Sequence, residues 1–119
     1  MKTYLLILRD HERRWEQFSP DEMQRTIERF NAWSESLRDK ERFVGAGKLT
    51  SDLGSTVRSR DGNLVVDGPF SEAKEAIGGY FCIRAESEEE AAALAKGCPI
   101  LTYGGSVEVR ELAHVADPG

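Results

Sequence analysis

The chain has few of the residues that hold metals or form cross-links. Its 119 residues include two cysteines, Cys82 and Cys98, and two histidines. The cysteines form no C-x-x-C pair and have no histidine at the spacing of a zinc site. We therefore expect free, buried cysteines, no metal and no cofactor. Gly78-Gly79 is not part of a G-x-x-x-x-G-K phosphate loop, so close backbone packing explains this pair.

Basic runs and long apolar runs are both missing. Lys and Arg number 16 against 21 Asp and Glu, a net charge of −5, which disfavours non-specific binding to nucleic acid or anionic membrane. The first apolar stretch, Tyr4 to Leu8, is too short for a signal-peptide core or a membrane span. These absences predict a cytoplasmic protein with no nucleic-acid or membrane partner.

What the chain does contain is an alternation of apolar strands and capped helices. Ser19-Pro20-Asp21-Glu22 is a capping box with proline at the first helical position, and it predicts a long helix to about Lys40. Ser87 to Glu90 repeats the signature and predicts a second helix that ends at Gly97. Asp61-Gly62 is a tight-turn dipeptide and predicts a hairpin. The expected strands are 3–9, 43–50, 56–60, 63–67, 80–85 and 106–112, with at most one or two helical turns at 71–76.

This order predicts one α+β domain over residues 1–112, followed by a frayed tail at 113–119. Two βαβ units joined through the middle make a ferredoxin-like (βαββαβ) sandwich with an inserted β-hairpin, in which both helices cover one face of a four-stranded sheet. Helical spacing predicts that the first helix lays one apolar stripe on the sheet. The stripe consists of Met23, Ile27, Phe30 and Leu37, with Trp33 flanking it.

The first strand has more apolar surface than two helices can cover. One of its faces carries Tyr4, Leu6 and Leu8, and the other carries Leu5 and Ile7. Either a partner subunit or the inserted hairpin must cover the second face. We expect a homodimer that packs sheet to sheet, because closed twofold pairs are the commonest soluble oligomers.

The stretch from Asp61 to Tyr80 concentrates turn residues between apolar runs, where functional groups are commonly displayed. Its motifs are Asp67-Gly68-Pro69-Phe70, Lys74-Glu75 and Gly78-Gly79-Tyr80, and Cys98-Pro99 and Gly104 to Arg110 follow. With these motifs the chain resembles the DGPF branch of the YCII-related proteins over nearly its whole length. The resemblance implies a dimeric α/β-barrel fold, and it implies that Asp67, Lys74, Glu75 and Tyr80 are the polar signature of the branch.

The acid–base pair attributed to YCII proteins cannot be carried over. That pair is a His and an Asp, with the Asp directly before a proline after the second helix. Here Cys98 precedes Pro99, and the first helix has no histidine around Phe30 and Asn31. Some members of the branch lie beside sigma-factor genes, which implies transcription regulation as an alternative role.

The candidate site residues each have a functional and a structural interpretation. Asp67 is either a base at the mouth of a cleft or the first residue of an Asx turn. His11 is either a general base at the end of the first strand or an exposed loop histidine. Arg9 and Lys74 are the candidate anion anchors, although Lys74 suits a solvated surface position equally well. Asp10, Glu75 and Tyr80 complete the predicted substrate-binding set.

Two functions from different classes fit this sequence. The first is binding of a small-molecule ligand in a cleft between the hairpin, the DGPF turn and the end of the first strand. Asp67 and His11 would then carry out cofactor-independent acid–base catalysis. The second is a non-catalytic dimeric module that acts through a protein partner, as in transcription regulation. An apolar pocket with convergent polar groups favours the first, and an exposed apolar patch favours the second. The sequence leaves open whether any turnover occurs.

Overall fold

The computed structural model describes residues 1–11, 17–50, 52, 54–67 and 75–116. In chain order these form β1 (Lys2–His11), α1 (Pro20–Asp39), β2 (Phe43–Lys48), β3 (Thr56–Arg60), β4 (Asn63–Asp67), β5 (Glu75–Ala85), α2 (Glu88–Ala95), a 3-10 helix η2 (Pro99–Tyr103) and β6 (Ser106–Glu111). In this part of the chain no helix is long and apolar enough to cross a membrane.

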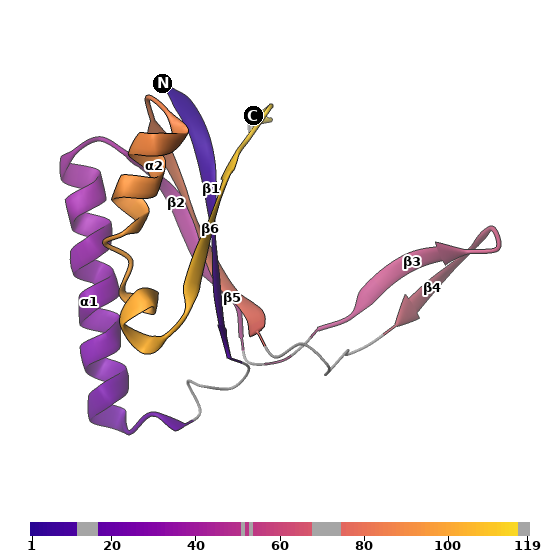
Figure 1. The fold of residues 1–119 in the computed structure, drawn as a ribbon. Coiled ribbons are helices and arrows are strands. Elements are labelled where there is room, and N and C mark those ends of the chain that lie inside the picture. Colours follow the sequence, from indigo (N-terminus) through magenta and orange to yellow (C-terminus); the bar gives the residue numbers. More distant parts are fainter. Residues whose placement is uncertain (12–16, 51, 53, 68–74, 117–119) are drawn as a thin grey trace.

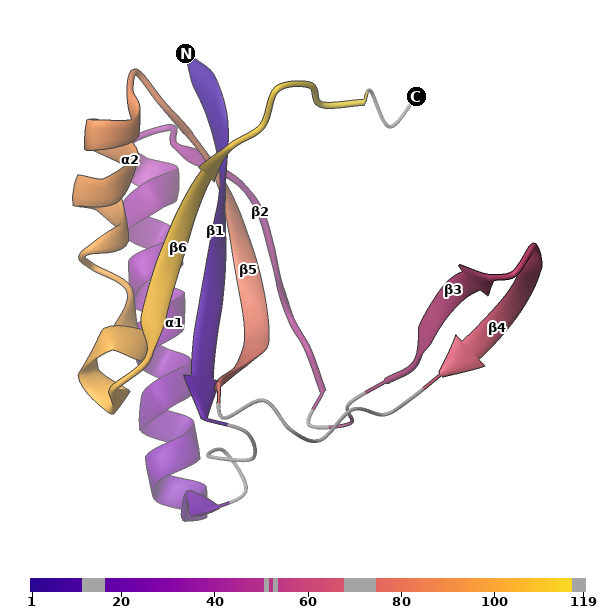
Figure 2. The ribbon, with the colours of Figure 1, turned by 45° about the vertical axis from the view of Figure 1, so that its right-hand side comes forward.

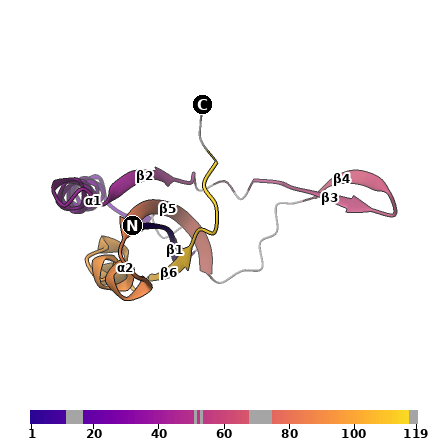
Figure 3. The ribbon, with the colours of Figure 1, turned by 90° about the horizontal axis from the view of Figure 1, so that it is seen from above.

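The main sheet is four-stranded, with the order β2-β5-β1-β6 and antiparallel neighbours throughout. α1 and α2 cover one face, and the separate β3–β4 hairpin projects away on the other side of the sheet (Figure 1). The view from above likewise shows the helices on one side of the sheet and the hairpin extending away on the other (Figure 3). This is the ferredoxin-like α+β arrangement with an inserted hairpin that the sequence predicts.

The helix starts follow from the capping residues. Ser19 Oγ accepts a hydrogen bond from the Glu22 backbone N–H at 3.1 Å, and Pro20 occupies the first helical turn. Ser87 Oγ accepts from the Glu90 N–H at 3.1 Å in the same way. Each hydroxyl satisfies a donor that has no partner inside the helix, so each helix begins where the capping box predicts.

The core lies between the helices and the covered face of the sheet. Tyr4, Leu6 and Leu8 of β1 point into it, and their register places Leu6 opposite Phe81. The Trp33 and Phe81 rings lie 4.4 Å apart between centroids, which ties α1 to the centre of the sheet. From α2 only the small side chains of Ala91 and Ala95 are buried, so this helix sits close to the strands.

The buried stripe of α1 differs from the prediction. Thr26, Trp33 and Leu37 are its buried residues, whereas Ile27 is 46% exposed. Thr26 can be buried because its hydroxyl donates to the Glu22 carbonyl at 2.8 Å and lies 2.9 Å from the Tyr103 hydroxyl. The expectation for Ile27 was wrong because the predicted stripe counts apolar residues alone. It leaves out Thr26, which can be buried because its hydroxyl is hydrogen-bonded within the protein.

β5 begins earlier than predicted. Glu75 and Ala76, assigned from the sequence to a short helical turn, are the first residues of this strand. They pair with His11 and Asp10, so the end of β1 provides the partner that holds them extended. The other residues of that predicted turn, 71–74, lie outside the described part of the chain. Predicted strand 43–50 ends at Lys48, although the Leu49 N–H still donates to the Gly78 carbonyl at 2.9 Å.

Candidate functional site

A pocket of about 280 Å³ opens between α1 and the β2–β5 side of the sheet. Leu8 and Phe81 lie at its base on the covered face, and the 3-10 helix contributes Ile100. α1 supplies a wall of mixed polarity. The wall residues are Met23, Thr26, Ile27, Phe30, Asn31 and Ser34.

Small residues leave this space open. Ala46, Gly47, Gly78 and Gly79 line the pocket along β2 and β5. A Cβ on Gly79 would lie 2.6 Å from the Gly47 carbonyl oxygen, so the two strands approach more closely than any larger residue allows. Farther along β2, the Arg38 guanidinium stacks 4.3 Å from the centre of the Phe43 ring and fixes the other end of α1. Helix and strand are therefore bridged by large side chains at one end and separated by small ones at the other.

The pocket has an apolar interior, and among the described residues that line it Lys48 is the charged one. Two of the polar groups in the wall bond within α1, since Ser34 Oγ donates to the Phe30 carbonyl at 2.9 Å and Thr26 to that of Glu22. Asn31 adds an amide that is exposed. An apolar cavity with one ammonium group and one amide suits a small ligand with an apolar body and an anionic or strongly polar end.

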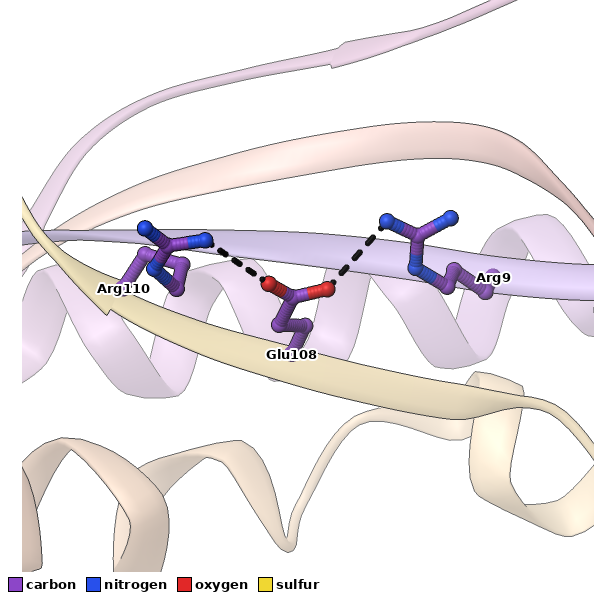
Figure 4. A network of polar contacts seen from close by, with 3 residues as sticks. All are labelled: Arg9, Glu108 and Arg110. Atoms are coloured by element: carbon purple, nitrogen blue, oxygen red, sulfur yellow. Dashed lines mark hydrogen bonds and ion pairs between the residues drawn. The ribbon is translucent and has the colours of Figure 1, made fainter.

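Arg9 lies on the opposite, open face of the sheet (Figure 4). Its Nη2 is 3.2 Å from Glu108 Oε1, and Arg110 Nη1 donates to Glu108 Oε2 at 3.1 Å. The hydrogen bonds from Arg110 and Arg9 lower the pKa of Glu108 below its usual value. Arg9 thus belongs to a three-membered ion network on β1 and β6, and its role as anion anchor stays a prediction.

The strand register places Asp10, His11 and Glu75 at one end of the sheet. Asp10 pairs with Ala76 and His11 with Glu75, at the end of β1 nearest the pocket residue Leu8. Asp10 is only 3% exposed and shares the helix-covered face with Leu8. The side chains of His11 and Glu75 lie outside the described part of the structure.

Tyr80 and Asp67 lie in two further places. Tyr80 is on the open face, 42% exposed, with its ring so close to Gly47 that a Cβ there would lie 2.7 Å from it. Asp67 ends β4, where its Oδ2 is 2.9 Å from Arg58 Nε and 3.1 Å from Arg60 Nη2. These ion pairs are internal to the hairpin, which stands apart from the sheet (Figure 2). Lys74 lies outside the described residues, as do the three residues of the DGPF turn that follow Asp67.

The two cysteines are free, as expected. Cys98 is 2% exposed, and burial raises the pKa of its thiol to about 11. Cys82 is half-buried on the open face, and burial raises its pKa as well. A thiol is nucleophilic as the thiolate, so neither cysteine is activated. The described residues also contain no group of three His, Cys, Asp or Glu side chains that could hold a metal ion.

Sequence reasoning missed Lys48 and the polar positions of α1. The only local signal was the run Gly45-Ala46-Gly47-Lys48, in which small residues precede a lone lysine on a predicted strand. Small residues in a strand indicate close backbone approach. They do not reveal which helix residues will face them, because that depends on how α1 crosses the sheet.

Comparison with known protein families gives a match over almost the whole chain. The model of the YCII-related domain matches residues 2–115. No curated protein matches the chain.

Proposed function

The chain belongs to the YCII-related family, and from that premise we propose that it binds a small ligand in the pocket between α1 and the β2–β5 side of the sheet. The ligand class we propose is a compact apolar or aromatic molecule with an anionic end, such as a small carboxylate. The observation that carries the proposal is the apolar pocket with Lys48 as the charged residue among the described residues that line it. The motif Asp67-Gly68-Pro69-Phe70 supports the finer assignment to the DGPF branch.

The size of the pocket limits the ligand. Its volume of about 280 Å³ lies just below the usual range of small-molecule sites, which is about 300–1,000 Å³. A bulky cofactor does not fit this space, whereas a single ring or a short aliphatic chain does. An ammonium group at the edge of an apolar site fixes the orientation of such a ligand through a charge-assisted hydrogen bond.

Cofactor-independent acid–base catalysis is the further step of this proposal. Asp10 follows Leu8 by two residues and shares its face of the sheet, so the strand at the base of the pocket also carries one proton-transfer group near its end. The part of His11 in catalysis stays a prediction, because its side chain lies outside the described part of the structure. A His or Asp can act as a general base where a substrate proton comes within hydrogen-bond reach. Asp67, the other predicted base, is held by Arg58 and Arg60 in the hairpin, and its catalytic role needs a second arrangement of that hairpin.

The test is ligand binding to Lys48→Met, with Lys40→Met as the matched control. Lys40 is an exposed lysine that follows the end of α1 and does not line the pocket. The protein is screened by native mass spectrometry and NMR against small carboxylates and their uncharged amides, for example benzoate and benzamide. We expect Lys48→Met to weaken carboxylate binding by about tenfold or more, since a hydrogen bond to a charged group contributes about 1.5–3 kcal/mol.

The two kinds of probe separate the possible outcomes. Amide binding should change little in Lys48→Met, and neither probe should respond to Lys40→Met. If no probe binds at millimolar concentration, or if Lys48→Met binds carboxylates as tightly as the parent, the proposal is wrong.

A second candidate function is that of a non-catalytic dimeric module that acts through a protein partner, as in transcription regulation. The open face of the sheet favours it, because this face carries apolar side chains that no helix covers. They are Leu5, Ile7, Ile77, Tyr80 and Cys82. We propose that a second copy of the chain packs on this face to form a homodimer, which sedimentation equilibrium will detect or exclude.

A further inference from the structure

The β3–β4 hairpin has one apolar face and one charged face. The pairs Val57–Val66 and Ser59–Leu64 put the apolar side chains on one side, and the pairs Arg58–Val65 and Thr56–Asp67 put the ion pairs on the other. Val57, Leu64 and Val66 are 66%, 81% and 69% exposed. Among the described residues none covers this apolar face.

A hairpin of this kind needs a cover. A two-stranded hairpin alone is at best marginally stable in water, and it gains independent stability by packing its apolar face against another element. Figures 1 and 3 show the hairpin projecting from the side of the sheet opposite α1 and α2. The open face of the sheet and the hairpin therefore lie on the same side of the molecule.

We propose that the hairpin is an exchanged arm, which packs its Val57, Leu64 and Val66 face on a second copy of this chain. This inference rests on the proposed homodimer and adds the arm to it. A second copy seated on the open face lies on the side to which the hairpin projects (Figure 2). Twofold symmetry then gives both copies the same contact, so one assembly covers two open sheet faces and two hairpins.

The size of a stable interface also favours a second copy that uses both surfaces. Stable interfaces involve about 20–30 residues a side. The strands of the main sheet are 6 to 11 residues long, and only every second residue points to the open face. The open face alone therefore falls short of that number, and the arm supplies additional contact area.

The experiment compares Leu64→Ser/Val66→Thr with the matched control Val65→Thr. Val65 lies between the two substituted residues on β4 but points to the charged face. The dimer dissociation constant is measured by sedimentation equilibrium, and far-UV circular dichroism checks the fold. We expect the double variant to raise the dissociation constant about tenfold or more, and Val65→Thr to change it less than threefold.

A second measurement detects the arm directly. Methyl-labelled chains are mixed with unlabelled chains, and isotope-filtered NOE spectra report only contacts between copies. The inference predicts intermolecular NOEs from the methyl groups of Leu64 and Val66. A dimer without these NOEs that is unaffected by the double variant overturns the arm and leaves the sheet dimer in place. A chain that stays monomeric at all concentrations overturns both.

Discussion

At the scale of single residues, Gly79 decides how closely β2 and β5 approach beside the pocket. It is buried in β5 and pairs with Lys48, the charged residue of the pocket. A methyl group at Gly79 would lie 2.6 Å from the Gly47 carbonyl oxygen, and backbone cannot move aside as a flexible side chain can. The absence of a side chain at Gly79 is therefore a requirement of packing, as the strand position of this glycine indicates.

Gly79→Ala and Gly45→Ala form a matched pair of substitutions in the same two strands. A Cβ on Gly45 has no neighbour within 4 Å. We expect Gly79→Ala to lower the free energy of unfolding by about 1–3 kcal/mol, as overpacking does. Gly45→Ala should leave it unchanged or raise it by up to about 1 kcal/mol, because alanine restricts the unfolded chain. Urea unfolding measures both, and equal effects of the two substitutions would contradict this account of the close approach.

At the scale of elements, the order of helices and strands along the chain followed from local sequence signals. Both capping boxes lie in the sequence and need no tertiary contact to be recognised, so the starts of α1 and α2 were predicted within one residue. The Asp61-Gly62 turn likewise placed β3 and β4. Asp61 has φ 54° and Gly62 has φ 81°, the left-handed conformations that such a tight hairpin turn requires.

The features that the sequence did not predict depend on contacts between elements. Glu75 and Ala76 have the composition of a helical segment, yet pairing with β1 makes them strand. Thr26 is buried because Tyr103, from a distant part of the chain, lies beside its hydroxyl. The pocket depends on the position of α1 relative to β2, so neither its location nor its lysine could be obtained from periodicity. The family of the chain, in contrast, was evident from motifs along the sequence, and it is confirmed over residues 2–115.

Asp67→Asn tests whether the carboxylate at the end of β4 is an architectural clamp of the hairpin. It removes ion pairs to Arg58 and Arg60, which are exposed and therefore contribute about 0–1 kcal/mol. We expect hydrogen exchange of the β3 and β4 amides to become faster, while the global free energy of unfolding changes by less than about 1 kcal/mol. Asp61→Asn removes the same charge from the same hairpin and is tolerated, because Asn also adopts positive φ.

The comparison also distinguishes architecture from function for this residue. If the β3 and β4 amides of Asp67→Asn exchange hydrogen at the same rate as those of Asp61→Asn, but ligand binding is abolished, Asp67 belongs to the site. Loss of protection in the hairpin with unchanged ligand affinity would make it a structural residue.

At the scale of the whole molecule, the predicted domain boundary at residue 112 can be examined through the pairing of β6. β6 pairs with β1 from Arg9↔Ser106 to Tyr4↔Glu111, and Val107 and Val109 pack against the core. The Leu112 N–H still donates to the Thr3 carbonyl at 2.9 Å. Beyond it, residues 113–116 are exposed. This pairing is consistent with the boundary at residue 112, which stays a prediction.

A chain shortened to residues 1–112 should therefore fold with nearly full stability. We expect its midpoint of thermal unfolding to lie within about 4 °C of the parent, which for a domain of this size corresponds to less than about 1 kcal/mol. A chain that ends at Gly105 loses β6, exposes the β1 edge and uncovers the core next to Leu6 and Leu8, so it should not fold cooperatively. Circular dichroism melts of the three chains decide the point. A large loss of stability in the 1–112 chain would show that the segment after Leu112 takes part in the fold or in its assembly, and the domain boundary would have to be moved.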